Sequence, residues 1–369
     1  MDAFLKDGSL LKKNKVLIAV SGGTSLALIK FLSQEQHRFI FKEYFSIFSF
    51  IYIEEEGLMT KTSSLSYIQE KINEIFPESS FFPISLKSYI LNSSNNVKLL
   101  WDRDSDTVLT SQVFGKSIHS IDDILLPLLS PTSRIDILRC LRNNIIYDFA
   151  EKNGYSVIIF GDTATSIASK IISETAKGRG YSIPWKTRGK IKYSNNIWLL
   201  RPMKDIIKQE ACFFLQINGI QSEITNFDHK ITTIDELTDQ YFDNLEKSNS
   251  NFIFTVVKTA MKLQIPNIGS IKKDQSSSFC FICQMPKESN IKDWIKKITI
   301  DKFDTKNVSN INTDYNYHNY NNKTEDLCYG CLSMLKGLKS HIVFPCTELR
   351  NNNEARNPKN EVLSKYLIE

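Results

Sequence analysis

Short apolar runs that end in glycine turns and lead into helical patterns dominate the first half of the sequence. Val16 to Val20 ends in Ser21-Gly22-Gly23, and Leu28, Phe31 and Leu32 follow at helical spacing. Val157 to Phe160 likewise ends in Gly161-Asp162-Thr163 before a second helical pattern. This alternation predicts an α/β fold with a parallel sheet and helices on both faces, and it places ligands at the carboxyl ends of the strands.

Other segments extend the same pattern. Phe45 to Ile53 indicates a second buried strand, which ends in an acidic turn at Glu54-Glu55-Glu56-Gly57. Tyr67 to Phe76 is typical of the helix that follows it. Apolar residues from Ile135 to Phe149 recur at intervals of three and four, which predicts a helix ended by Gly154.

The length and composition fit a folded protein of about two domains. The chain has 369 residues, of which 41% are hydrophobic and 24% charged, so it is neither a disordered tail nor a fibre. No signal-peptide pattern and no apolar run long enough to span a bilayer appears, so we expect a cytoplasmic protein with reduced thiols and no membrane partner. The five histidines are scattered, and no Ser/His/Asp set or H-E-x-x-H helix supports hydrolase chemistry.

Two C-x-x-C pairs are the strongest local signal. Cys280 with Cys283, and Cys328 with Cys331, can together give tetrahedral thiolate coordination, so we predict a structural zinc ion; four unligated thiols are the alternative. We expect a degenerate ATPase-like domain over 1–265, a cysteine-rich zinc-ribbon-like module over 266–350 with an asparagine-rich insertion at 302–324, and a tail over 351–369. Cys140 and Cys212 are expected to be buried filler rather than nucleophiles.

The turn Ser21-Gly22-Gly23-Thr24-Ser25 offers backbone amides to a phosphate at a helix N-terminus, with Gly161 and Asp162 expected beside it. ATP-using loops of this type continue with an Asp and a Ser, but here Ser25 and Leu26 stand in those places. Ser25 cannot supply a carboxylate to Mg²⁺, so the binding of ATP and magnesium is doubtful. A tight turn without any ligand is the alternative.

No acidic residue occurs from Thr175 to Met203, although cations are frequent there. With the interleaved rings of Tyr181, Trp185, Tyr193 and Trp198, they predict a basic strip that contacts the phosphates of a nucleic acid and stacks on its unpaired bases; a solvated basic loop is the alternative. Reversing Arg179 and Arg188 to Glu is expected to weaken this binding and leave the fold intact. The predicted contacts, which include one cation just after the acid-free stretch, are Lys177, Arg179, Lys186, Arg188, Lys190, Arg201 and Lys204, and Lys192 adds a further positive charge.

Several of these segments, taken in order, resemble the cytoplasmic tRNA 2-thiolation protein 2 family. They are Ser21-Gly22-Gly23, Tyr52 to Gly57, Gly161-Asp162-Thr163, Glu174 to Gly180, Arg201 to Asp205 and Leu327 to Cys331, and the similarity covers about residues 15 to 335. No single motif is specific to this family, but the occurrence of A-K-G-R-G, R-P-M and L-C-Y-G-C in this order is. The family usually has further cysteine pairs ahead of the S-G-G loop, which are not found before Ser21 here.

The resemblance implies a PP-loop, adenine nucleotide alpha hydrolase type of fold and a heterodimer with a catalytic thiolase subunit. That complex takes sulfur from a thiocarboxylated ubiquitin-like carrier and installs it at position 2 of the wobble uridine in tRNAs for Lys, Glu and Gln. Because the loop lacks its Asp and Ser, the chain looks like the non-catalytic partner, and the resemblance implies that its basic strip helps to hold tRNA. An autonomous ATP-dependent tRNA-modifying enzyme and a zinc-ribbon adaptor for proteins are the alternative functions.

Overall fold

The computed structural model describes the greater part of the first 263 residues and short segments around the cysteine pairs. The described residues are 14–35, 45–55, 65–92, 98–102, 107–110, 121–193, 197–221, 233–263, 279–287, 291, 327–335 and 342–345. The predicted insertion at 302–324 and the predicted tail at 351–369 lie outside them.

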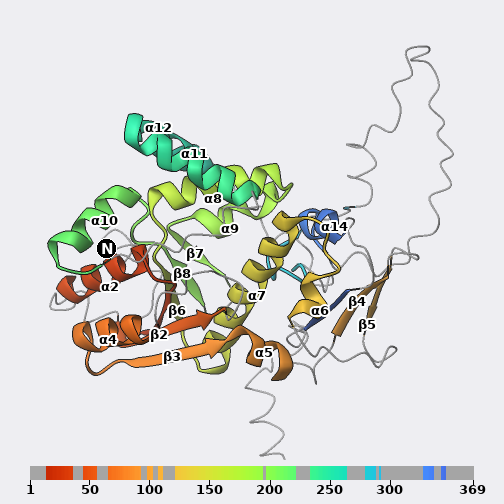
Figure 1. Ribbon diagram of the computed structural model, residues 1–369, viewed down its shortest axis with the longest axis horizontal. Helices are drawn as coiled ribbons and strands as arrows, with labels where there is room; N and C mark the ends of the chain where they lie inside the picture. The colour runs from red at the N-terminus through yellow and green to blue at the C-terminus, as the bar shows by residue number, and fades with distance from the viewer. Residues whose placement is uncertain are drawn as a thin grey trace, which may run out of the picture.

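A six-stranded sheet forms the centre of the molecule, in the order β3-β2-β1-β6-β8-β7 (Figure 1). Every neighbouring pair is parallel except β7 with β8. The predicted parallel α/β sheet is therefore confirmed. The strands are β1 (Asn14–Val20), β2 (Phe45–Glu54), β3 (Ser80–Ser85), β6 (Val157–Phe160), β7 (Lys190–Lys192) and β8 (Trp198–Leu200).

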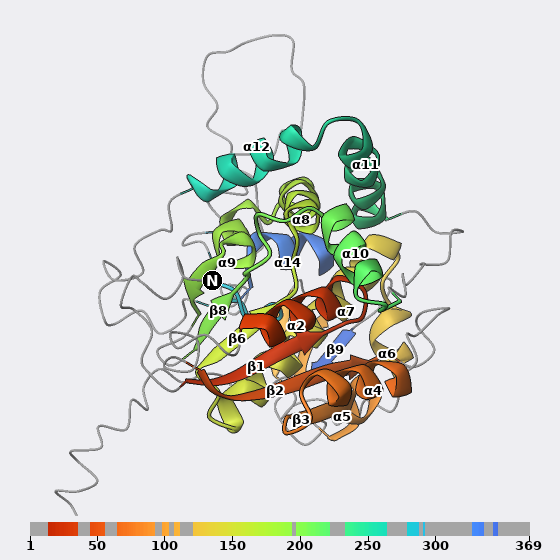
Figure 2. The ribbon, with the colours of Figure 1, turned by 90° about the vertical axis from the view of Figure 1, so that its left-hand side faces the viewer.

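Helices cover both faces of this sheet because its central strand is apolar on both sides (Figure 2). Val16, Ile18 and Val20 pack with α2 (Thr24–Glu35), α4 (Leu65–Ile75) and α10 (Lys208–Ile217). Leu17 faces the other way, into a core that includes α5 (Leu86–Asn92), α6 (Asp122–Leu125) and α7 (Pro131–Lys152).

Local signals explain where the long helices begin and end. Ser130 is extended and Pro131 opens α7, where a missing N–H has no cost. Gly154 follows that helix at φ +67°, a conformation that favours glycine. The Thr163 side chain accepts a hydrogen bond from the Ser166 amide at the start of α8 (Ala164–Ala176), and Gly178 follows its end at φ +73°.

A third layer packs on α8 and carries its own apolar cluster. It consists of α9 (Ile183–Thr187), α11 (Ile234–Ser248) and α12 (Ser250–Met261), and the η3 turn (Gly180–Ser182) links α8 to α9. No described helix has the length and apolarity needed to cross a membrane.

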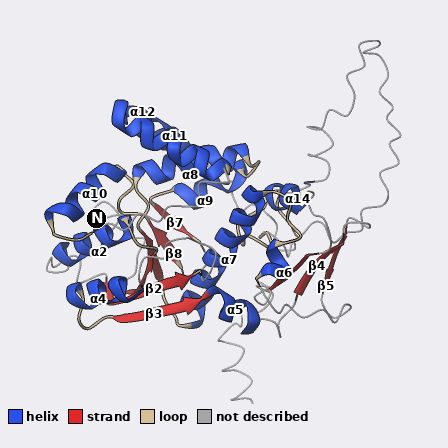
Figure 3. Cartoon of the chain, viewed as in Figure 1, coloured by secondary structure: helices blue, strands red, loops and turns tan. Residues whose placement is uncertain are grey.

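The segments around the cysteine pairs share the main core. Cys280, Cys283, Leu327 and Leu332 belong to the same hydrophobic cluster as Leu17. A small antiparallel sheet of β4 (Lys98–Asp102), β5 (Thr107–Thr110) and β9 (Ile342–Pro345) also joins the two halves of the chain (Figure 3). The helix α14 (Tyr329–Leu335) begins directly after Cys328 and includes Cys331. The division into domains at residue 265 stays a prediction, but the segments on either side of it do not have separate cores.

Candidate metal centre and the pocket beside it

The four predicted zinc ligands lie together in the structure. The sulfurs of Cys280, Cys283, Cys328 and Cys331 are all within 4.8 Å of one another, and all four residues are buried. The first pair lies in a tight turn, closed by hydrogen bonds from the Gln284 amide to the Cys280 carbonyl (2.8 Å) and from the Cys280 amide to the Met285 carbonyl (2.7 Å). The second pair opens α14.

The spacing of the sulfurs fits a single tetrahedral ion. Cys283 Sγ and Cys328 Sγ are 3.8 Å apart, and sulfurs at about 2.3 Å from one zinc ion have roughly this separation. A four-iron cluster would need its ligands further apart, since iron and sulfide atoms lie between them. The Cys331 amide is 3.5 Å from Cys328 Sγ, a backbone donor of the kind that stabilises a thiolate. Four thiolates would supply zinc with a complete ligand shell and leave no open position for chemistry.

A fifth cysteine lies beside this cluster. The Cys140 thiol, on α7, is hydrogen-bonded to Cys331, which together with nearby Arg179 and Lys186 lowers the pKa of Cys140 to about 7. The prediction that Cys140 is buried is confirmed. Its neighbours could not be predicted, because periodicity along a helix does not reveal which distant segment packs on it.

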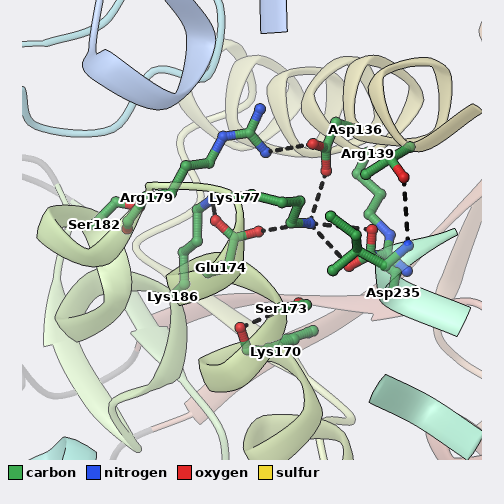
Figure 4. A network of polar contacts seen from close by, with 12 residues as sticks. Asp136, Arg139, Lys170, Ser173, Glu174, Lys177, Arg179, Ser182, Lys186 and Asp235 are labelled. Atoms are coloured by element: carbon green, nitrogen blue, oxygen red, sulfur yellow. Dashed lines mark hydrogen bonds and ion pairs between the residues drawn. The ribbon is translucent and has the colours of Figure 1, made fainter. Parts of the chain in front are cut away.

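Part of the predicted basic strip lies in a buried ion-pair network rather than on the surface (Figure 4). The Lys177 Nζ is 2.8 Å from Asp136 Oδ1 and 2.9 Å from Asp235 Oδ1, and 5% of its side chain is exposed. Arg179 pairs with Asp136 at 3.0 Å, and Lys186 pairs with Glu174 at 2.5 Å. The expectation that these cations form an exposed strip is wrong for Lys177, Arg179 and also Arg201, because acids outside the acid-free stretch bind them.

The network shifts the pKa values of Glu174 and Lys186 in the direction that favours their charged forms. Burial would raise the pKa of Glu174, but Lys186, Arg179 and Lys177 lower it well below its ordinary value. Burial would likewise lower the pKa of Lys186, but Glu174 raises it above the usual range for a lysine. Asp235 also pairs with Arg139 of α7, so the network joins α7, α8 and α11.

Most of the remaining strip residues are partly exposed. The Arg188 Nη2 donates to the Leu263 carbonyl at 2.6 Å, and the Lys190 ammonium lies 5.2 Å from the centre of the Trp198 ring. Lys204 pairs with Asp205 at 2.5 Å, and Lys192 is exposed. Two predicted stacking rings are buried: Trp185 is 2% exposed, and Tyr193 packs on Tyr147 with ring centres 4.3 Å apart. Contact with tRNA stays a prediction, and these partly exposed cations are the residues still accessible for it.

The glycine loop lies at the topological switch point of the sheet, between β1 and β6, and it is closed by its own hydroxyl groups. Ser25 Oγ donates to the Gly22 carbonyl (2.8 Å) and accepts from the Ser21 amide (3.2 Å), while Thr24 Oγ1 donates to the Gly161 carbonyl (3.2 Å). A Cβ on Gly161 would lie 2.9 Å from the Ser25 Cα, so the two loops touch. The hydroxyl of Ser25 thus uses the Ser21 amide, which a phosphate cradle would leave free.

Asp162 is also engaged within the protein. It pairs with Lys170 (2.6 Å) and with Arg201 Nε (3.0 Å). Burial would raise its pKa, but these two cations lower it below the ordinary value. A cavity of about 100 Å³ opens between Asp162 and the cysteine cluster, with Cys140, Lys186 and Cys283 in its wall.

The family model and the relatives that match this chain carry the same description. The family model described as cytoplasmic tRNA 2-thiolation protein 2 matches residues 233–333. Proteins that bear this name are similar to the chain. One from Schizosaccharomyces pombe is 26% identical over 347 residues, which are 91% of this chain and 83% of the relative. One from Saccharomyces cerevisiae S288c is 27% identical, and the match covers 69% of this chain and 64% of the relative. One from Phaeosphaeria nodorum is 33% identical over 46% of this chain and 45% of its own length.

Among solved structures, the fold is similar to that of the U34-tRNA thiolase NcsA from Methanococcus maripaludis, which was determined with its [4Fe-4S] cluster. The TM-score is 0.53 at 14% identity, over 76% of this chain and 84% of that one. This similarity shows the fold, which agrees with the predicted PP-loop type.

Proposed function

Because this chain belongs to the cytoplasmic tRNA 2-thiolation protein 2 family, we propose that it is a non-catalytic subunit of the cytosolic complex that makes 2-thiouridine at the wobble position of tRNA. It binds a catalytic thiolase subunit as a heterodimer, and it helps to hold the tRNAs for Lys, Glu and Gln. The complex receives sulfur from a thiocarboxylated ubiquitin-like carrier.

One observation above all supports the non-catalytic role. The S-G-G loop bonds to itself through Ser25, and no carboxylate follows its glycines. ATP-dependent activation of a uridine oxygen requires a site that accepts the triphosphate and its Mg²⁺, and magnesium prefers carboxylate and phosphate oxygens. The only acid in the expected set, Asp162, is paired with Lys170 and Arg201. This subunit therefore supplies binding surface, and its partner supplies the chemistry.

We also propose that Cys280, Cys283, Cys328 and Cys331 hold one structural zinc ion. The 3.8 Å separation of Cys283 and Cys328 and the burial of all four thiols support it. A bound ion would cross-link the two cysteine pairs. It would take no part in a reaction, since the four thiolates would fill its coordination sphere.

To test the main proposal, the gene is deleted in its own organism and then restored as the wild type or as a variant. Nucleoside mass spectrometry measures 2-thiouridine in the cytosolic tRNA of each strain. Deletion should abolish the modification, and the wild-type chain and Ser25→Ala should restore it. Ser25→Ala tests the loop directly, because we assign Ser25 no role in metal binding. Unchanged 2-thiouridine after deletion would exclude the proposed function.

A second candidate is a zinc-ribbon adaptor that contacts only proteins, and the burial of Lys177, Arg179 and Arg201 favours it. Salt dependence of tRNA binding separates the two functions. A subunit that contacts tRNA phosphates loses affinity steeply as salt rises, whereas an adaptor shows no specific tRNA binding at any salt concentration.

A further inference from the structure

Arg179 lies directly on the backbone that carries the second cysteine pair. It follows Gly178 at the end of α8, and 4% of the residue is exposed. A Cβ on Gly330 would overlap the Arg179 Cγ and would lie 2.8 Å from its Nε, so only glycine at position 330 leaves room for this side chain. Gly330 immediately precedes Cys331. A Cβ on Gly178 would in turn lie 2.6 Å from the Tyr329 ring, so the two segments interlock.

The guanidinium has more donors than the described residues satisfy. Its Nη1 pairs with Asp136 Oδ2 at 3.0 Å, and its Nη2 is 3.6 Å from the Met334 Sδ, a weak acceptor. Within the part of the chain that the structure describes, its Nε has no hydrogen-bond partner although it is buried. A buried N–H without an acceptor is costly, and in native proteins such a group usually has a partner.

The lining of the cavity has more cations than carboxylates, which favours an anion nearby. Five cations line it, namely Arg139, Lys170, Arg179, Lys186 and Arg201, against three carboxylates, namely Asp136, Asp162 and Glu174. The wall therefore has an excess of two positive charges. Four thiolates bound to one divalent zinc ion carry a net charge of −2, and Cys283 belongs to the same wall.

We propose that Arg179 is a positioning residue of the metal centre, whose Nε donates a hydrogen bond to the thiolate of Cys331 when zinc is bound. The inference rests on the zinc ion proposed above. The same guanidinium binds Asp136, which in turn binds Lys177 and through it α11. Occupancy of the metal site is thereby linked to the ion pairs that join α7, α8 and α11. The contact with tRNA that the sequence predicts for Arg179 is thus replaced by a role inside the protein.

The test uses the full-length protein in two measurements. The first replaces zinc with ¹¹³Cd and looks for through-bond coupling between the metal and an arginine Nε–H, which is transmitted only if that N–H donates to a bound thiolate. The second measures the rate of zinc transfer to a chromogenic chelator. Arg179→Lys keeps the charge but removes Nε. The control is Arg142→Lys, which lies on α7 and pairs with Glu55.

We expect an arginine Nε–H coupled to ¹¹³Cd in the wild type and in Arg142→Lys, and none in Arg179→Lys. Groups that orient metal ligands typically contribute about 10–100-fold to metal affinity, so zinc should leave Arg179→Lys about tenfold faster or more. If Arg179→Lys does not fold, the presence or absence of the coupling in the wild type still tests the role of Arg179.

The other outcomes separate the two proposals. A wild-type chain without zinc would overturn the proposed metal site. A wild type that holds one zinc ion but shows no coupling, with release from Arg179→Lys within twofold of the wild type, would overturn the role of Arg179 alone. Tight binding of inorganic phosphate by the zinc-loaded chain, lost in Arg179→Lys, would show that the excess charge binds a free anion, and would also contradict the inference.

Discussion

Several charged side chains of this protein form ion pairs with each other in the interior, and Lys177 is the clearest example. Its ammonium lies between Asp136 and Asp235, and each of the three side chains is at most 6% exposed. A buried pair of this kind gives little net stability over apolar residues, but the loss of one partner leaves an uncompensated buried charge.

Lys177→Met should therefore destabilise the fold by about 3–5 kcal/mol. Lys204→Met is the matched control, because Asp205, the partner of Lys204, is mostly exposed and such pairs contribute at most about 1 kcal/mol. Urea unfolding followed by circular dichroism measures both. Equal unfolding midpoints for the two variants would show that the network is not structural.

The carboxylates of the network also predict how stability depends on pH. The pKa values of Glu174, Asp162 and Asp235 are lower in the folded state than in the unfolded chain, so their contribution is fully present above the unfolded values of about 4. It is lost as pH falls below about 4 towards the folded values. Urea midpoints between pH 7 and 3 should drop steeply only at the acid end, and Glu174→Gln should reduce that drop. A drop already complete at pH 5 would require another group.

At the scale of elements, the strands and helices of the first half could be predicted because their apolar periodicity is local. The expected strand Val157 to Phe160 and the helix that contains Ile135 to Phe149 are both present. The meeting of the four cysteines at one site could also be predicted, since their spacing is itself the signal. The partners of Lys177 and Arg179 could not, because Asp136 and Asp235 are distant in the sequence and only the packing of three helices brings them together.

The close packing of Gly330, on α14, against Arg179, after α8, predicts a steric effect that does not depend on charge or metal. Gly330→Ala should force Arg179 aside and destabilise the protein by about 1–3 kcal/mol, because the site has no free volume. Gly180→Ala is the control, since nothing lies within 4 Å of a Cβ there. Thermal unfolding compares the two variants. A Gly330→Ala protein as stable as Gly180→Ala would mean that the contact is loose.

The metal site itself is tested by removing a ligand. Cys328→Ser should lower the zinc content from one per chain to near zero and destabilise the segments around both pairs, because metal binding to such sites contributes on the order of 10 kcal/mol. Cys212→Ser, at a partly buried cysteine outside the cluster, should keep its zinc. Elemental analysis of the purified variants measures this. Full zinc in Cys328→Ser would refute the site.

At the scale of the whole molecule, the net charge of +5 is a poor guide to where an acidic partner binds. Three of the cations that the sequence predicts to contact tRNA, namely Lys177, Arg179 and Arg201, have buried side chains. Replacing Arg179 with Glu would place a second carboxylate beside Asp136. Such a change is expected to damage the fold, contrary to the expectation drawn from the sequence. The surface of β7, with Lys190 and Lys192, is one part of the strip that remains accessible to tRNA.

Reversing Lys190 and Lys192 to Glu together should weaken tRNA binding and flatten the plot of log affinity against log salt by about two units, one for each lost phosphate contact. The control Lys71→Glu, on α4, should change neither quantity. Filter binding across a salt series is sufficient. An unchanged slope would favour the adaptor function instead.

We propose above that this chain, whose fold is similar to that of a tRNA thiolase, does not carry out ATP-dependent chemistry itself. The most direct measurement is pyrophosphate release from ATP by the purified, zinc-loaded chain in the presence of tRNA and Mg²⁺, without any partner subunit. We predict no release above that of a sample without protein. Sustained release over many turnovers by the chain alone would contradict the account.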